Sequence, residues 1–212
     1  MCDFGSVVFL SLVWRVGKRE RKDKNVFKIV RTEALTDAIY LMDVEAPRVA
    51  KNCLPGQFVI VRGSEDGERI PLTICDYSRE AGTITIVFQV VGAATEMMKN
   101  LKVGDSFTDF VGPLGRPSEL VEEDLETLKN KKILFVAGGV GTAPVYPQVK
   151  WLHEHGVAAD VIIGGRSKEL IILEEQMKAV AGNLYITTDD GSYGSKGVVT
   201  NEIQKLNNRR IS

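Results

Sequence analysis

A glycine-rich turn is the segment of this sequence best suited to chemistry. The run Gly138-Gly139-Val140-Gly141-Thr142-Ala143-Pro144 stands between an apolar segment and a sequence typical of a helix. Glycines let the backbone approach a pyrophosphate closely, and the free N–H groups at a helix N-terminus attract its negative charge. Pro144 suits a helix start because its missing N–H would have had no partner there. The spacing differs from the G-x-G-x-x-G fingerprint, so tight packing of strand against helix is the alternative interpretation.

Two more polar turns follow apolar runs, at the kind of sheet edge where open α/β sheets bind ligands. They are Gly164-Gly165-Arg166-Ser167-Lys168 and Asp189-Asp190-Gly191-Ser192-Tyr193-Gly194. Arg166 and Lys168 could hold the adenosine end of a dinucleotide or a 2′-phosphate, although cations at a turn are usually solvated. Asp189 and Asp190 could contact ribose or nicotinamide amide groups. With two carboxylates and no histidine nearby, we expect no metal site there.

The first half of the chain holds two further candidate segments. Arg69-Ile70-Pro71-Leu72-Thr73-Ile74 combines a cation, a rigid proline and a hydroxyl. An arginine aimed at a phosphate and a Thr73 hydroxyl close to a flavin ring nitrogen would explain this combination. Its composition alone also fits an edge strand. Gln89-Val90-Val91-Gly92-Ala93-Ala94-Thr95 passes from a strand into a helix and is therefore a second possible anion site.

Two kinds of framework are expected to position these segments. Short β-branched and aromatic runs separated by turn residues predict strands at 27–30, 39–44, 58–61, 83–88 and 107–111, with a short helix at 94–101. Strands at such close spacing indicate an antiparallel barrel or sandwich. In the second half, apolar runs at 133–137, 161–163 and 184–187 alternate with helices predicted at 143–155 and 169–180. This alternation indicates a doubly wound parallel sheet.

The fold class predicted is therefore an antiparallel β-barrel followed by a doubly wound α/β domain. We expect a barrel domain at 26–117, a connecting segment at 118–131 with a helical turn through 122–128, and an α/β domain at 132–208. Residues 1–25 differ in pattern from the rest of the chain and are expected to be an extension outside the folded unit. As a hypothesis, Val26 could be the true initiator, and N-terminal sequencing that found Met1 would contradict it.

Composition excludes several classes of function. Lys and Arg number 27 against 28 Asp and Glu, so there is no positive excess to bind nucleic acid. The apolar run at 7–14 is shorter than the roughly 20 residues that span a bilayer, and its charges are not arranged as in a secretory signal. Cys2, Cys53 and Cys75 lie far apart, which indicates a reducing, cytoplasmic compartment and no metal or cluster held by this chain alone.

Taken in order, these segments resemble the ferredoxin-NADP⁺ reductase superfamily. The most similar branch contains the electron-transfer subunit of dihydroorotate dehydrogenase and the small subunit of NADH-dependent reduced ferredoxin:NADP⁺ oxidoreductase, and the run at 45–50 favours the latter. The resemblance covers roughly residues 27–206. It rests on Pro55-Gly56-Gln57-Phe58-Val59, Arg69 to Ile74, Val90 to Thr95, Gly112-Pro113-Leu114-Gly115, Gly138 to Pro144, and Asp189 to Gly194.

The resemblance implies two cofactors and a set of residues for each. FAD would lie on the barrel, and NAD(H), with NADP(H) as the alternative, on the second domain. For FAD the set is Arg69, Pro71, Leu72 and Thr73 along the ring and phosphates, with Val91, Gly92 and Thr95 at the pyrophosphate. For the nicotinamide nucleotide it is Gly138, Gly139, Gly141, Thr142, Pro144 and Arg166, with Asp189, Asp190 and Gly191 flanking the nicotinamide. No catalytic side chain is implied, because the cofactors carry the chemistry.

The chain also departs from the pattern of its branch. Ile70 stands where the dihydroorotate type has arginine, and Gly92-Ala93-Ala94-Thr95 replaces a common Gly-x-Gly-Thr loop. Members of the branch continue past the position of Ser212 into a segment that binds a 2Fe–2S cluster, so we interpret this chain as truncated and expect it to bind flavin but no cluster.

Three functions remain open at this point. The first is an enzyme that passes electrons from NADH through FAD, and in the complete protein through the cluster, to a larger flavin and iron–sulfur subunit of a heterodimer, with ferredoxin involved indirectly. In a variant of this function, the partner is dihydroorotate dehydrogenase. The second is a non-catalytic docking subunit, and the third is a nicotinamide-nucleotide-binding domain without flavin.

Overall fold

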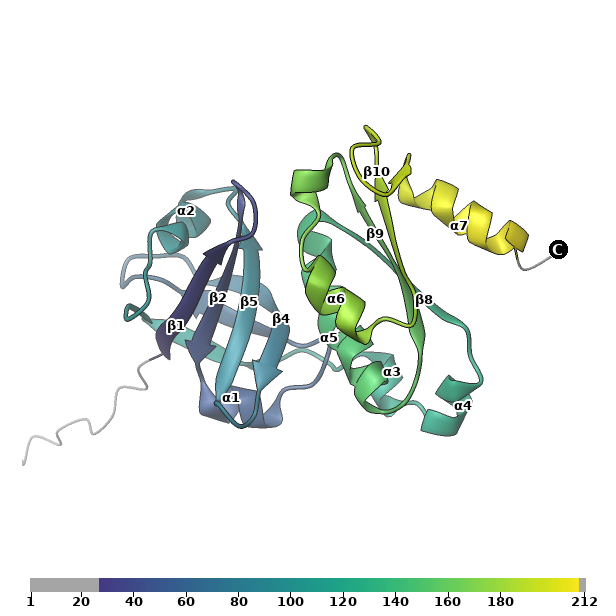
Figure 1. The fold of residues 1–212 in the computed structure, drawn as a ribbon. Helices are drawn as coiled ribbons and strands as arrows, with labels where there is room; N and C mark the ends of the chain where they lie inside the picture. Colours follow the sequence, from purple (N-terminus) through teal and green to yellow (C-terminus); the bar gives the residue numbers. More distant parts are fainter. Residues whose placement is uncertain (1–26, 210–212) are drawn as a thin grey trace, which may run out of the picture.

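The computed structural model describes residues 27–209, which form two units lying side by side (Figure 1). The N-terminal extension expected at 1–25 and Cys2 lie outside the described residues. The first unit is a nearly closed antiparallel sheet in the order β6-β1-β2-β5-β4-β3-β7. Its strands are β1 (Phe27–Ala34), β2 (Ile39–Glu45), β3 (Phe58–Arg62), β4 (Ile70–Ser78), β5 (Thr83–Gln89), β6 (Ser106–Phe107) and β7 (Asp109–Leu114). The helices α1 (Pro47–Asn52) and α2 (Ala93–Lys99) connect strands at opposite ends of the barrel.

The second unit is a parallel sheet in the order β11-β10-β9-β8. Its elements are β8 (Ile133–Gly138), the 3₁₀ turn η1 (Gly139–Gly141), α5 (Thr142–Glu154), β9 (Ala159–Gly165), the 3₁₀ turn η2 (Lys168–Leu170), α6 (Glu174–Val180), β10 (Leu184–Thr188), β11 (Ser195–Lys196) and α7 (Val199–Arg209). The helices α5 and α6 lie between the sheet and the barrel, and α7 lies on the other side of the sheet (Figure 1). The predicted fold class is confirmed.

Alternation along β5 explains how the barrel packs in two directions. Ile84, Ile86 and Phe88 are fully buried in the barrel core. Val87 points the other way, into a second core that the barrel shares with the α/β unit. Successive side chains of a strand face opposite sides, so one strand contributes to both cores.

The shared core joins the two units through apolar contacts. Leu41 and Cys75 of the barrel pack with Tyr146 and Val149 of α5 in one buried cluster. An ion pair reinforces this contact at its margin, with Lys150 Nζ 2.7 Å from Asp76 Oδ1. An apolar interface between domains restricts their relative motion.

Two predicted helices differ from those in the structure. The helix predicted at 169–180 begins at Glu174, because Ile171, Ile172 and Leu173 form a consecutive apolar run that packs into the shared core in non-helical conformation. Leu173 adopts a left-handed φ of 57°, which turns the chain into α6. The expectation of one uninterrupted helix there was wrong.

The connecting segment also differs from its prediction. Instead of one helical turn at 122–128 it forms α3 (Glu119–Glu122) and α4 (Leu125–Lys129). The Asp124 side chain caps α4 by accepting from the Thr127 N–H at 2.9 Å, and Leu128 packs against Leu152 in a third small core. The alternative of an edge strand for the segment at 69–74 was wrong, because β4 lies between β5 and β3.

None of the helices in the described part of the chain is long and apolar enough to cross a membrane.

Candidate functional site

The glycine-rich turn joins β8 to α5 and is open to a ligand. Gly139 has a positive φ of 51°, a conformation that favours glycine. A Cβ atom added at Gly139 or at Gly141 would meet no atom within 4 Å. The empty space beside these two residues lets a ligand approach the backbone at the N-terminus of a 13-residue helix, where anions are favoured.

Two other glycines at the strand ends are required by packing. A Cβ at Gly138 would lie 3.0 Å from the Gly164 carbonyl oxygen, and a Cβ at Gly164 would collide with Val199 Cγ1 of α7. Packing therefore accounts for Gly138, whereas the space beside Gly139 and Gly141 is open.

A cleft of about 760 Å³ runs along the carboxyl ends of the parallel strands. We call it the sheet-edge cleft. Its lining comes from both units: Ile39, Gln89, Val136, Ala137, Gly138, Gly139, Val140, Gly164, Gly165, Arg166, Leu170, Thr187, Asp189, Val198 and Val199. Gly138, Gly164 and Thr187 are paired across the sheet and form a row along its floor.

The polar turns after β9 and β10 are only partly in this cleft. Arg166 and Asp189 line it, whereas Lys168 has its Nζ 5.0 Å from the centre of the Tyr193 ring. The Asp190 carboxylate accepts the Ser192 N–H at 2.8 Å, and hydrogen bonding by Ser192 lowers the pKa of Asp190. Asp190 therefore shapes its own turn, whereas Asp189 lines the cleft.

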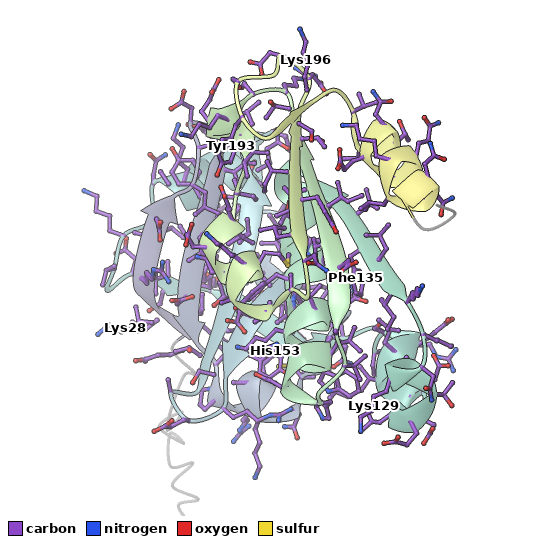
Figure 2. The ribbon with its side chains drawn as sticks, turned by 45° about the vertical axis from the view of Figure 1, so that its right-hand side comes forward. Lys28, Lys129, Phe135, His153, Tyr193 and Lys196 are labelled. Carbon is purple, nitrogen blue, oxygen red and sulfur yellow. The ribbon has the colours of Figure 1, made fainter. Side chains whose placement is uncertain are left out.

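The two histidines lie away from this end of the molecule. Figure 2 shows Tyr193 and Lys196 at one end of the sheet and His153 at the C-terminal end of α5, near the opposite end. The His155 ring stacks on Trp151 with centroids 4.0 Å apart. Neither histidine lines the sheet-edge cleft, in keeping with a role at the helix end.

Two neighbouring threonines at the end of β10 differ in whether their hydroxyls are hydrogen-bonded. The Thr188 hydroxyl donates to the Tyr193 carbonyl at 2.7 Å and accepts the Tyr193 N–H at 3.0 Å. The Thr187 hydroxyl is buried on the floor of the sheet-edge cleft and has no hydrogen-bond partner among the described residues. The Thr142 hydroxyl at the start of α5 is also buried without a partner there.

These two states give opposite expected effects on stability. Thr187→Val should raise the free energy of unfolding by about 1 kcal/mol, because a buried unpaired hydroxyl costs roughly 1–3 kcal/mol. Thr188→Val should lower it by about 2 kcal/mol, since two bonds to Tyr193 are lost. Urea denaturation of the ligand-free variants measures both changes, and a loss of stability in Thr187→Val would contradict this assignment.

A second cleft, of about 420 Å³, lies between the barrel and α5. We call it the interdomain cleft. It is lined by Ile70, Pro71, Leu72, Thr73, Val87, Phe88, Gln89, Val91, Thr95, Val140, Gly141, Ala143 and Pro144. The segment at 70–73, the entry to α2 and the glycine turn are far apart in sequence but surround one space.

The entry to α2 is fixed by one side chain. The buried Thr95 hydroxyl accepts the Val91 and Gly92 N–H groups at 3.0 and 3.1 Å and donates to the Gly92 carbonyl at 2.9 Å. Its hydrogen-bonding capacity is used within the turn. Thr95 therefore shapes the first turn of α2 beside the cleft, with Val91 80% exposed at its rim.

Arg69 is not brought together with the other residues of its segment. Its Nη2 lies 2.6 Å from Asp109 Oδ2 of β7, and Arg62 Nε lies 2.8 Å from the same oxygen. Arg69 is absent from the lining of both clefts. Arg69 lies just before the start of β4, and its guanidinium pairs with Asp109 of β7 instead of facing either cleft.

The two cysteines in the described residues are buried and unpaired. Burial raises the pKa of Cys53 from 9.0 to about 11 and raises that of Cys75 further. Within residues 27–209, no group of three or more His, Cys, Asp or Glu side chains is arranged to hold a metal ion.

Comparison with known proteins identifies the family. Models of protein families give no match. A dihydroorotate dehydrogenase B electron transfer subunit from Streptococcus mutans is 34% identical over 185 residues, which are 86% of this chain and 69% of that protein. The chain belongs to this family. An electron transfer subunit homolog from Thermotoga maritima is 40% identical over 179 residues, 84% of this chain and 61% of its own length.

The relation extends to solved structures. The structure of NADH-dependent reduced ferredoxin-NADP oxidoreductase matches with a TM-score of 0.77 and 39% identity, over 87% of this chain and 64% of that one. A Neisseria gonorrhoeae ferredoxin NADP⁺ reductase with bound FAD and NADP matches with a TM-score of 0.64 at 15% identity, over 85% and 75% of the two chains, which shows the shared fold. The chain is thus of the ferredoxin-NADP⁺ reductase type. It spans slightly under two thirds of the length of several relatives, 62% for an uncharacterized Clostridium beijerinckii protein to which it is 58% identical.

Sequence reasoning missed several lining residues of this family member. Ile39, Val198 and Val199 line the sheet-edge cleft as apolar residues outside any motif. Gln89 and Val140 are, among the described residues, the two that line both clefts. Their position inside the motifs at 89–95 and 138–144 was the available signal, but neither residue type indicated a role.

Proposed function

We propose that this protein binds FAD in the interdomain cleft and NAD(H) in the sheet-edge cleft, as an NAD(P)H-dependent flavin oxidoreductase subunit. The observation that carries the proposal is that the two clefts meet at Gln89 and Val140. When bound, the cofactors supply the redox chemistry, in which a hydride passes from the dihydronicotinamide to the flavin ring. Direct transfer requires the two rings to be in contact, and adjoining clefts permit this.

The barrel side of the interdomain cleft fits a flavin. Pro71 and Leu72 offer a rigid apolar wall, and Thr73 places a hydroxyl beside it. We propose that this wall lies along the ring and that the turn at 91–95 lies near the pyrophosphate, where Thr95 holds the backbone in position. Arg69 pairs with Asp109 through one nitrogen and is otherwise exposed, and its contact with a flavin phosphate stays a prediction.

The α/β side fits a dinucleotide. The open space at Gly139 and Gly141 accommodates a pyrophosphate against the N-terminus of α5. Arg166 and Asp189 lie after the second and third strands of the sheet, and we propose that Asp189 contacts a ribose hydroxyl. The described residues then bind and orient both cofactors and exclude water, and no proton-transferring side chain is needed.

In the complete protein, we propose that electrons pass from FAD through a 2Fe–2S cluster to a larger flavin and iron–sulfur partner subunit, as in ferredoxin:NADP⁺ oxidoreductases. The family relation and the 39% identity to such an oxidoreductase support this proposal. A partner of the dihydroorotate dehydrogenase type is the alternative, because relatives carry that name. The buried unpaired thiols Cys53 and Cys75 agree with a cytoplasmic location.

The visible spectrum of the purified protein tests this proposal. We expect flavin absorption that is bleached by NADH in the absence of oxygen, with about one FAD per chain. A colourless protein that FAD does not reconstitute would contradict the proposal and favour a docking subunit or a flavin-free nucleotide-binding domain. Iron and acid-labile sulfide are measured in the same sample, and we expect none to be held by this chain.

Nucleotide preference gives a further prediction. NADH should bleach the flavin faster than NADPH at equal low concentration, as the names of the relatives suggest. Arg166→Ala should then slow reduction by NADPH about tenfold, because a charged hydrogen bond is worth roughly 1.5–3 kcal/mol, and should change reduction by NADH less than threefold. Lys168→Ala, which loses its contact with the Tyr193 ring, is the matched control. Faster reduction by NADPH in the parent would show that the preference is reversed.

A further inference from the structure

Gln89 stands at the junction of the two clefts. It is the last residue of β5, and its backbone is fixed by pairing with Ile39 of β2. The next residue continues this contact, because the Val90 N–H donates to the Ala38 carbonyl at 2.8 Å. The position of Gln89 is therefore set by the barrel, whereas its side chain is exposed.

The direction of the side chain follows from the regular register of β5. No bulge interrupts the pairing of β2 with β5, so Gln89 faces the same side as Val87, which packs into the shared core toward α5. On this face of β5, the apolar side chain of Val87 is followed by the amide of Gln89, which lies where the two clefts meet. Of the two described residues that line both clefts, only Gln89 has a side chain that can form hydrogen bonds.

The chemistry of an amide at this place suits one particular group. A glutamine side chain has an N–H₂ donor and a carbonyl acceptor and carries no charge. The carboxamide of a nicotinamide ring presents the complementary acceptor and donor. A ring that must reach the flavin has to lie where the clefts meet, which is where Gln89 lies.

We propose that Gln89 is a positioning residue that hydrogen-bonds the nicotinamide carboxamide and holds that ring against the flavin. This inference rests on the proposed function. A ring held by one amide pair is aligned for transfer, and misplacement by about 1 Å can cost roughly 100-fold in rate. The effect of losing Gln89 should therefore fall on the rate of flavin reduction and little on the affinity for the rest of the dinucleotide.

The experiment compares Gln89→Leu with the parent holoprotein. In stopped-flow measurements we expect the limiting rate of flavin reduction by NADH to fall 10- to 100-fold. The Kd of ADP-ribose, which lacks the nicotinamide, should stay within twofold, as should the flavin content. Gln89→Asn keeps an amide on a shorter side chain, and its limiting rate should lie between those of the parent and Gln89→Leu. Gln176→Leu, which removes an exposed glutamine of α6 away from both clefts, should match the parent.

A nucleotide analogue identifies the group that is bound. Reduced 3-acetylpyridine adenine dinucleotide keeps the acceptor of the carboxamide and loses its donor, so the rate ratio of NADH to analogue should shrink in Gln89→Leu. An unchanged limiting rate in Gln89→Leu would overturn the inference. So would an unchanged ratio together with a shifted flavin spectrum or potential, which would assign Gln89 to the flavin. If NADH does not reduce the parent's flavin, the proposed function itself fails.

Discussion

Replacing Gly141 with leucine is expected to slow flavin reduction by NADH about 100-fold without unfolding the protein. Gly141 lines the interdomain cleft, and a Cβ there would meet nothing within 4 Å. Its φ of −64° and ψ of −11° are helical, so any side chain is tolerated by the backbone. The added side chain must then occupy cleft volume, and overfilling a packed space costs roughly 1–3 kcal/mol, which corresponds to about 5- to 150-fold in rate or affinity.

The controls separate blocked binding from damage to the fold. Gly141→Ala should have a smaller effect than leucine, since a methyl group fills less of the cleft. Gly182→Ala changes an exposed glycine outside both clefts and should leave the rate unchanged. Without ligands, the urea concentration at the unfolding midpoint should decrease no more in Gly141→Leu than it does in Gly182→Ala. Parent-like reduction by the leucine variant would mean that neither cofactor lies against Gly141.

A steep loss of stability above pH 9 is the second large effect that we expect. Burial raises the pKa of Cys53 from 9.0 to about 11 and that of Tyr146 from 10.0 to about 12, and it also raises the pKa of Cys75. In each case the unfolded chain releases the proton at a lower pH than the folded protein does. The free energy of unfolding therefore falls as the pH rises between the two values, by about 3 kcal/mol for Cys53 between pH 9 and 11.

Removing the titrating groups should flatten this dependence. Urea unfolding of the parent between pH 7 and 11 gives the slope, and we expect a shallower slope above pH 9 for Cys53→Ala and above pH 10 for Tyr146→Phe. The phenylalanine variant keeps the ring that packs in the shared core. The same slope in the parent and both variants would mean that other groups cause the alkaline loss.

Local pattern was sufficient for β1, β2, β3 and β5 of the barrel and for β8, β9 and β10 of the parallel sheet. The single strand predicted at 107–111 was wrong, because the chain divides at Thr108 between β6 and β7. The alternation of β5 and the continuous apolar run of β8 are properties of single segments, and short-range pattern determines them. The resemblance to the family could also be predicted from the sequence, because each motif that carries it is a single short segment. Where several segments had to meet, the sequence was less informative.

Particular residues explain what the sequence did not reveal. Arg69 suggested a phosphate ligand, but its ion pair with Asp109 joins residues 40 positions apart, and no local pattern indicates that contact. The left-handed conformation of Leu173 is a response to the shared core, so the start of α6 depends on tertiary packing. Gln89 becomes notable only when two clefts built from both units are seen to meet there.

The core shared by the barrel and α5 limits how this protein can be re-engineered. A chimaera that takes its nucleotide-binding half from another reductase would have to keep the α5 face formed by Ala143, Tyr146 and Val149, because Ile39, Leu41 and Val87 are buried against it. A graft without that face would leave an apolar surface on each half. Exchange of cofactor preference is therefore better attempted in the turns after β9 and β10, which lie outside this core, than by swapping whole domains.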